Sequence, residues 1–473
     1  MVFSSLIFIF FLLPIALIFY HILPKQLHNS ILLAVSLFFY AWGEPTFIVL
    51  MVFSALVNYL FGRLIGRARV REKVTTARVY LWLSVVWNLA LLGFFKYAMF
   101  MMENLRVLFG SGVPVPQIHL PIGISFFTFQ IMSYVIDVWR GNVAVQKNFG
   151  KVLLYAMLFP QLVAGPIVRY ETVEQELAER HVTRESFTAG VTRFVIGLSK
   201  KILIANSVAV AADAIFDLPQ GELAVATAWV GVLAYTLQIY FDFSGYSDMA
   251  IGLGAMFGFS FPDNFRYPYL SSSVSGFWRR WHMTLGSWFR DYVYFPMGGS
   301  RCSTWRMVFN LFVVWSLTGL WHGASWSFVA WGVYYFVFIT IEKLLHKGKG
   351  DAYHPLGNLY TLLVVAVGWV LFRADTLSEA FGYLKSMIGL SGNALSDYNT
   401  SYYFTSKIGL FAVAVIAALP IIPFIKKKFW DHRNRAVRGV TAAASAIGIT
   451  ALFVVCTARL VSDSYNPFIY FQF

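Results

Sequence analysis

The feature that most constrains this chain is a succession of apolar runs, each close to the length that crosses a membrane. A helix needs about 20 apolar residues to span the hydrocarbon core of a bilayer. The first run, 2–23, has no basic region before it and no small-residue cleavage site behind it, so we expect a retained span and not a secretory signal. Further runs lie at 30–43, 46–66, 78–102, 121–139, 150–168, 223–241, 243–260, 307–320, 324–342, 356–373, 404–425 and 435–461.

The composition agrees with a membrane protein. Only 13% of the 473 residues are charged and 58% are hydrophobic, whereas a soluble domain carries about 25% charged residues. So few charges cannot cover a water-facing surface, which excludes a soluble enzyme and a disordered chain. The net charge of +14 therefore points to cytoplasmic loops and not to a nucleic-acid partner. Two cysteines cannot build a cysteine-rich metal site, and we expect no metal.

We predict an all-α, polytopic membrane protein with roughly eleven to fourteen membrane helices, some of them re-entrant because backbone at that depth must be buried in protein. The stretch 187–216 is doubtful as a span because it carries Arg193, Lys200 and Lys201. Linkers and internal repeats are absent from the sequence, so we expect one membrane domain over 1–473.

Basic residues indicate the orientation of the chain. The basic loops at 63–78 and 426–438 are expected on the cytoplasmic side, and the acidic stretch 374–403 on the outer side. Counting spans back from the first basic loop places the N-terminus outside.

The segment 277–296 alternates aromatic and cationic residues without a continuous apolar face, which predicts an interfacial helix at the cytoplasmic headgroup level. Its arginines are explained either by snorkelling within an aromatic belt or by an anion site for a phosphorylated donor such as coenzyme A, and the two are compatible. The donor-binding candidates here are Arg279, Arg280 and Arg290. His282 lies among them, where positive neighbours favour its neutral form, and its role is either structural or chemical.

His322 is the histidine most deeply embedded in apolar sequence. A buried histidine is usually structural, but three features favour chemistry. Gly319 and Gly323 permit an unusual backbone or the close approach of a ligand; Trp321 and Trp326 can wall a cavity and contact the donor; and the segment contains no acid to pair with the ring. An imidazole in a water-poor cavity suits a general base.

Other motifs and polar residues add less. The sequence has no G-x-S-x-G elbow, P-loop, H-E-x-x-H or G-x-G-x-x-G motif. Among the remaining histidines only His354 is kept as an outside candidate. Asp242 and Asp248 interrupt apolar sequence. They either line a central cavity or bond a neighbouring helix, and we favour a structural role in which they brace the histidine loops.

Two of these segments resemble the signatures of a known family. The stretch Phe277–Pro296, with Trp-Arg-Arg-Trp-His at 278–282, and the stretch Leu320–Trp326 are similar to the two signatures of the membrane-bound O-acyltransferase (MBOAT) family. Segments 120–130, 160–166 and 242–248 also fit the bacterial branch, so the similarity covers about 120–345. The resemblance implies a ring of helices around a central funnel, with His322 as the catalytic residue near its floor, and a position 282 occupied by Asn or His.

Within the family, the chain resembles most the bacterial membrane proteins of alginate O-acetylation. This implies transfer of acetyl from a cytoplasmic donor, acetyl-coenzyme A, across the inner membrane to mannuronate hydroxyls of alginate, without a tightly bound cofactor. The implied partners are a periplasmic acetyltransferase of the SGNH-hydrolase type and other alginate acetylation and polymerisation proteins. The aromatic tail 465–473 is a candidate docking segment for such a partner. The alternatives are acyl or D-alanyl transfer to another envelope polymer, a transporter, or a scaffold of the export complex.

Overall fold

The computed structural model describes residues 1–345, 353–421, 424 and 435–462. Every regular element in these ranges is a helix, which confirms the all-α prediction. Six of the described helices are long and apolar enough to cross a membrane, or up to seven if one bent pair counts as a span, so the protein is polytopic. The basic residues 426–433 and the tail 465–473 lie outside the described residues. The six helices that are long and apolar enough to cross a membrane are Phe47–Val70, Val74–Phe109, Arg184–Phe216, Trp326–Leu345, Pro355–Arg373 and Gly439–Ser462.

Several apolar runs fold into shorter or longer helices than their lengths suggested. The first run forms a π-helical turn, η1 (Phe8–Leu12), and the short helix α1 (Leu13–Ile22). The run 150–168 divides into α7 (Phe149–Met157) and α8 (Phe159–Leu162), because Pro160 lacks the N–H that would continue α7 and instead begins a new helix. The runs 223–241 and 243–260, in contrast, form the single helix α12 (Val225–Met256).

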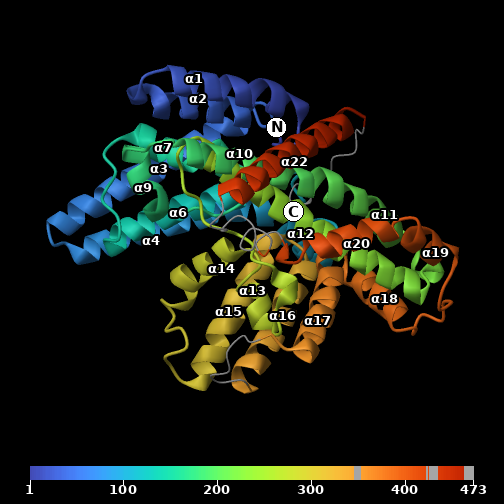
Figure 1. Ribbon diagram of the computed structural model, residues 1–473. Helices are drawn as coiled ribbons and strands as arrows, with labels where there is room; N and C mark the ends of the chain where they lie inside the picture. Colours follow the sequence, from blue (N-terminus) through green and yellow to red (C-terminus); the bar gives the residue numbers. More distant parts are fainter. Residues whose placement is uncertain (346–352, 422–423, 425–434, 463–473) are drawn as a thin grey trace. The chain divides into compact units, whose positions relative to one another are not determined.

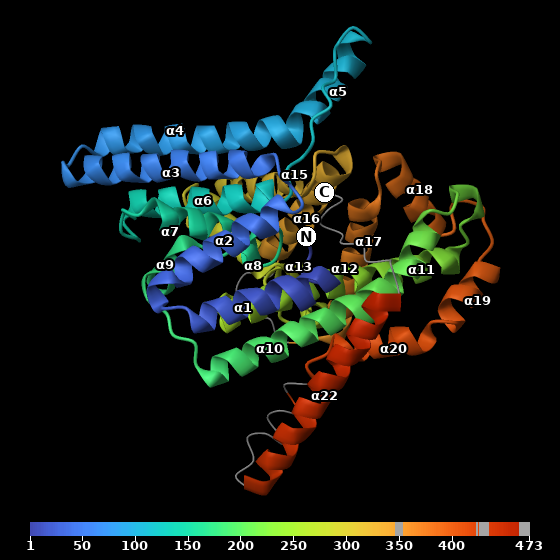
Figure 2. The ribbon, with the colours of Figure 1, turned by 90° about the horizontal axis from the view of Figure 1, so that it is seen from above.

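The described chain divides into two compact units. Unit 1 comprises 1–194 and 247–262. Its longest helices, α3 (Phe47–Val70) and α4 (Val74–Leu92), lie side by side (Figure 2). The buried side chains of Asn58 and Asn88 exchange hydrogen bonds of 3.1 and 2.7 Å between them, and such bonds hold helices together where lipid offers no alternative partner. The other elements of unit 1 are η2 (Lys25–Leu27), α2 (His28–Ala41), η3 (Gly93–Tyr97), α5 (Ala98–Phe109), α6 (Ile124–Arg140), α9 (Tyr170–Ala178) and most of α10 (Arg184–Ser199).

Unit 2 comprises 195–246 and the described part of 263–473. Helices α15 (Thr304–His322), α16 (Trp326–Leu345) and α17 (Pro355–Arg373) pack in sequence order (Figure 1). With them lie the short elements around the predicted site, namely α13 (Val274–Trp278), α14 (Met283–Phe289) and the π-helical η7 (Arg290–Tyr294). The remaining elements are η4 (Lys200–Ala205), α11 (Asn206–Phe216), η5 (Gln220–Glu222), η6 (Pro268–Leu270), α18 (Leu377–Met387), α19 (Tyr398–Thr405), α20 (Ile408–Ala417) and α22 (Arg435–Ser462).

The doubtful stretch 187–216 is part of a candidate span, Arg184–Phe216, so the doubt was wrong. Two of these charges, Arg193 and Lys201, have partners within their own unit. In unit 1, Arg193 Nε lies 2.9 Å from Asp248 Oδ1. In unit 2, Lys201 Nζ lies 2.6 Å from Asp242 Oδ1, and both side chains are 3% exposed. Pairing makes intramembrane charge tolerable. The ion pairs join each acid to a neighbouring helix, α10 for Asp248 and η4 for Asp242, and the bracing of the histidine loops stays a prediction.

Candidate functional site

His322 is the last residue of α15 and is 5% exposed. Three aromatic rings surround it edge to face, one from each of the helices α15, α16 and α17. Their centroids lie 5.0 Å away for Trp321, 5.0 Å for Trp331 and 5.2 Å for Phe372. Helix packing thus places the imidazole in a dry aromatic cage, the kind of setting in which a general base works without competition from water.

The glycines beside His322 serve helix packing. A Cβ on Gly319 would lie 3.2 Å from the Cα of Gly332 on α16 and would collide with the carbonyl oxygen of Phe328. A Cβ on Gly323 would collide with the ring of Phe328. Gly323 has extended backbone, φ −167°, and Gly319 lies within α15. The close approach expected at these two positions is therefore made by the protein itself, and the unusual backbone is not found.

The prediction of one interfacial helix over 277–296 is wrong. The segment is broken into α13, α14 and η7, and the break falls at 279–282. His282 has φ 44° and ψ 53°, a left-handed conformation that is uncommon for a residue other than glycine. Two backbone hydrogen bonds to the segment 264–266 bracket it: Met283 N donates to Asn264 O at 2.9 Å and Arg266 N donates to Arg280 O at 2.9 Å. The backbone bend turns His282 away from the helical path of its neighbours.

The side chain of His282 is 2% exposed. Its Nδ1 lies 3.1 Å from Asn264 Oδ1, and the ring of Phe243 packs against it at 4.7 Å. Burial lowers the pKa of His282 to about 3, because a charged imidazolium would lose its hydration. The neutral form that we predicted is thus favoured, but burial provides the reason and the neighbouring arginines do not.

Trp321 connects the two histidines. Its ring lies 5.0 Å from that of His322 and 5.8 Å from that of His282. These two distances bound the separation of the imidazole centroids at about 11 Å. The structure therefore brings together two residues that are 40 positions apart in the sequence, as a shared site requires.

The predicted donor-binding residues occupy different settings. Arg279 is exposed, Arg280 is half-buried, and Trp326 is 55% exposed. The guanidinium of Arg290 is already engaged by Asp291, with Nε–Oδ1 at 2.8 Å and Nη2–Oδ2 at 3.2 Å. A phosphate would have to compete with that carboxylate for Arg290, whereas Trp321 lies buried between the histidines.

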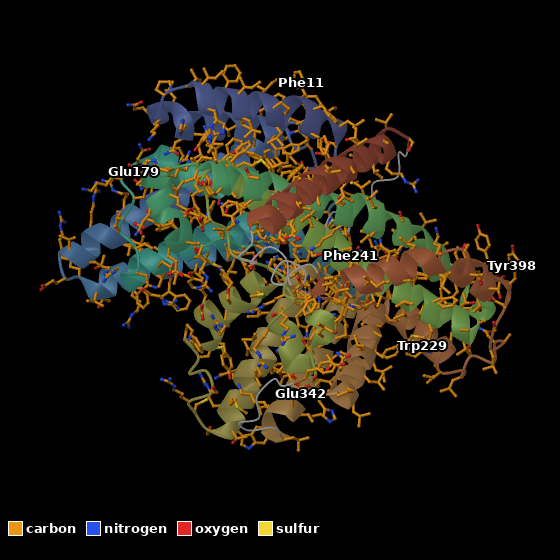
Figure 3. The ribbon with its side chains drawn as sticks, viewed as in Figure 1. Phe11, Glu179, Trp229, Phe241, Glu342 and Tyr398 are labelled. Carbon is orange, nitrogen blue, oxygen red and sulfur yellow. The ribbon has the colours of Figure 1, made fainter. Side chains whose placement is uncertain are left out.

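The site is supported by residues that the sequence did not single out. Glu342 on α16 accepts hydrogen bonds from Val274 N at 2.6 Å and Ser275 N at 2.8 Å, so its carboxylate caps the start of α13; Figure 3 labels it. The next residue, Lys343, donates to Tyr294 OH at 2.7 Å. Consecutive residues of α16 thus hold both ends of the segment that carries His282.

His354 has a structural role. It is the N-cap of α17, where its Nδ1 accepts a hydrogen bond of 3.4 Å from Gly357 N. In the described part of the chain, His, Cys, Asp and Glu side chains do not gather in groups of three that could hold a metal ion.

Comparisons with known proteins show similarity to membrane acyltransferases. The model of the MBOAT, membrane-bound O-acyltransferase family matches residues 74–348, a range that contains both histidines. Over the full length of both chains, the protein is 40% identical to the probable alginate O-acetylase AlgI of Azotobacter vinelandii. It is 32% identical to the peptidoglycan O-acetyltransferase of Helicobacter pylori, over 84% of this chain and 81% of the relative. It is 29% identical to the teichoic acid D-alanyltransferase of Bacillus subtilis, over 53% of this chain and 68% of the relative.

Proposed function

We propose, from the premise that this chain belongs to the membrane-bound O-acyltransferase family, that it carries out the membrane step of alginate O-acetylation. Family membership and the named activities of its relatives make it a multi-pass membrane acyltransferase. The acceptor is proposed from the end-to-end match to a probable alginate O-acetylase. The observation that carries the proposal is the pair of buried histidines whose rings both pack near the ring of Trp321, which supports a reaction centre at this place.

In the proposed reaction, His322 acts as the general base. It takes the proton from an acceptor hydroxyl as that oxygen attacks the carbonyl carbon of an acetyl thioester. A C–O bond forms, the C–S bond breaks, and the proton passes from the imidazolium to the departing thiolate. The rings of Trp331 and Phe372 keep water from the imidazole and so disfavour hydrolysis of the thioester.

The proposed donor is acetyl-coenzyme A, reaching the site from the cytoplasm. Arg279 and Arg280 offer guanidinium forks suited to its phosphates, and Arg290 would contribute only after releasing Asp291. Replacing Arg279 with Gln should raise the KM for acetyl-coenzyme A with little change in kcat, because the phosphates bind alike in the ground and transition states.

The remaining parts of the proposal concern location and partners. We place the protein in the bacterial inner membrane with its N-terminus in the periplasm, where the acetyl group leaves to alginate or to a partner acetyltransferase of the SGNH-hydrolase type. The distribution of basic residues in the sequence supports this orientation. The direct acceptor is identified by incubating purified protein and partner with radiolabelled acetyl-coenzyme A and following the label.

The test of the proposal replaces His322 with Ala in an alginate-producing strain that lacks its own membrane acetylase. The polymer is purified and its O-acetyl content measured by proton NMR, and the amount of protein in the membrane is measured by immunoblot. Loss of a general base typically costs about 10²–10⁴ in rate, so acetylation should fall below detection at unchanged protein level.

The matched control is His354→Asn, which keeps an N-cap acceptor for α17 and should leave acetylation unchanged. Normal acetylation by His322→Ala would contradict the assignment of the base. If the wild-type protein restores no alginate acetylation but acetylates peptidoglycan, the acceptor is wrong and the acyltransferase activity stands.

A further inference from the structure

Asn264 is buried beside the site, 1% exposed, in the segment between α12 and α13. Three donors converge on its side-chain oxygen Oδ1. Thr284 N lies 3.3 Å away, Thr284 Oγ1 lies 2.9 Å away, and His282 Nδ1 lies 3.1 Å away. One amide oxygen therefore fixes both the first turn of α14 and the imidazole that precedes it.

This convergence determines which nitrogen of His282 carries the proton. The backbone N–H of Thr284 can only donate, so the atom that faces it must be the amide oxygen and not the NH₂ group. An oxygen can only accept, so His282 Nδ1 must be the protonated nitrogen. In a neutral ring the lone pair then belongs to Nε2.

The surroundings keep the ring in this state. Arg279 and Arg280 are the charged residues next to it in the chain, and Asp263 and Arg266 flank Asn264. Asp242 precedes Phe243, whose ring packs against His282, and His322 lies across Trp321 on α15. Burial nevertheless lowers the pKa of His282, because a charged imidazolium would lose its hydration. Nε2 is therefore a hydrogen-bond acceptor throughout the physiological pH range.

The left-handed backbone of His282 also depends on Asn264. A left-handed conformation at a residue other than glycine is strained and persists only where the surroundings impose it. Asn264 imposes it twice, through its carbonyl oxygen to Met283 N at 2.9 Å and through Oδ1 to the ring. The strained residue is thus His282, whose ring packs near the same Trp321 ring as that of the proposed base, His322.

We propose that Asn264 is a positioning residue for the acyl transfer: it holds His282 with the proton on Nδ1, so that Nε2 accepts a hydrogen bond from a hydroxyl group of the acyl acceptor. The proposal rests on the proposed function for the identity of that acceptor. It divides the work of the two histidines, since His322 moves the proton and His282 orients the acceptor.

The tautomer is tested on the wild-type protein without reference to activity. Purified protein carrying ¹⁵N-labelled histidine is studied in detergent, and the His282 ring is assigned by the signals lost in His282→Asn. Throughout pH 5 to 8 we expect a protonated Nδ1 and an unprotonated Nε2. A proton on Nε2, or titration of the ring near its ordinary pKa of about 6.5, would overturn the proposal.

The role is tested with Asn264→Asp, which keeps the accepting oxygen and adds a negative charge. That charge raises the pKa of His282, so Nε2 becomes a donor at low pH and an acceptor again at high pH. Acetyl transfer by this variant, relative to wild type, should fall at least tenfold at pH 6 and recover toward pH 9. A ratio that is constant with pH would refute the positioning role.

The matched control is Thr284→Val, which removes one donor to the same Asn264 oxygen without adding charge. It should lower stability slightly and leave the ratio to wild type independent of pH. A wild-type protein that shows the expected tautomer but acetylates no polymer would contradict the proposed function and the acceptor role of Nε2, and would leave only the tautomer assignment standing.

Discussion

The buried ion pair between Lys201 and Asp242 allows a prediction of definite size. The two atoms lie 2.6 Å apart and both side chains are 3% exposed, so each charge has exchanged water for its partner. Replacing Lys201 with Met leaves the carboxylate buried without its counter-charge, and such a change costs about 3–5 kcal/mol. Unfolding entropy is about 2.1 cal/mol/K per residue, or about 1 kcal/mol/K for a chain of 473 residues. The midpoint of thermal unfolding should therefore fall by about 3–5 °C.

The protein provides its own reporter for this measurement. Cys456 on α22 is buried and lies 3.5 Å from the hydroxyl of Ser199, which directly precedes η4. With Cys302→Ser as background, Cys456 is the remaining cysteine of the sequence. A thiol-reactive fluorophore then reports, as temperature rises, when the environment of η4 opens.

Two further variants decide whether the ion pair is the cause. Lys201→Met combined with Asp242→Leu removes both charges, and it should restore most of the midpoint because an apolar replacement of a buried pair is often neutral or stabilising. Arg193→Met breaks the more exposed pair with Asp248 and should cost about 1 kcal/mol or less. The reasoning is refuted if Lys201→Met leaves the midpoint unchanged, or if the double variant is less stable than either single one.

Three other predictions concern the site and its supports. Gly319→Ala should destabilise the protein by about 1–3 kcal/mol, because the added methyl group overpacks against α16. In the control Gly409→Ala the new Cβ meets nothing within 4 Å, and this change should stabilise α20 slightly. The midpoints of thermal unfolding distinguish the two variants. Glu342→Gln keeps one carbonyl oxygen for the two α13 amides and should lower the free energy of unfolding by about 1–3 kcal/mol. It should also reduce acetyl transfer more than the control Lys385→Gln on α18 does, and transfer rates at equal protein level check this. The pKa of His282 is about 3 in the folded protein and about 6.5 when unfolded, so the unfolded state binds more protons between these values. Stability should then fall as pH drops below about 6.5, by on the order of 5 kcal/mol at most; unfolding midpoints measured against pH should show this slope in wild type but not in His282→Asn.

The two histidines could be found in the sequence because they are polar residues in apolar or aromatic surroundings. Hydropathy is a local property, and it was sufficient to identify His322 and to predict the all-α fold. It also identified Asp242 and Asp248 as unusual. The cations that pair with them lie some 40 to 55 positions earlier in the chain, and a sequence pattern does not reveal which helices will be neighbours. The stretch 187–216 was therefore interpreted as too polar to span a membrane, although Arg193 and Lys201 are paired with carboxylates in the folded protein.

The supports of the site were missed for the same reason. Asn264 is an ordinary polar residue between two helices, and Glu342 resembles a charged residue at the end of a span. Their importance comes from the backbone amides that they meet, which depend on tertiary packing. The break at His282 was also hidden, because a left-handed residue has no hydropathy signal. Arg290 is different, since Asp291 stands directly beside it in the sequence and a pairing between them could have been anticipated.

The electrostatics of the site follow from burial more than from the number of cations nearby. Arg279, Arg280 and Arg290 lie within eight positions of His282 in the sequence, yet burial accounts for the lowered pKa of the ring. Arg290 gives its guanidinium to Asp291, and the aromatic rings around His322 carry no formal charge. A proton taken by His322 is therefore a large local change in charge, in surroundings of low dielectric where charge interactions are strong. A neutral His282 adds no repulsion to the imidazolium that forms at His322, whereas a protonated His282 would oppose it. Keeping His282 neutral thus favours the transfer of a proton to His322. A negative charge introduced at Asn264 lets His282 become protonated at low pH, and for this reason we expect it to change the pH dependence of acetyl transfer.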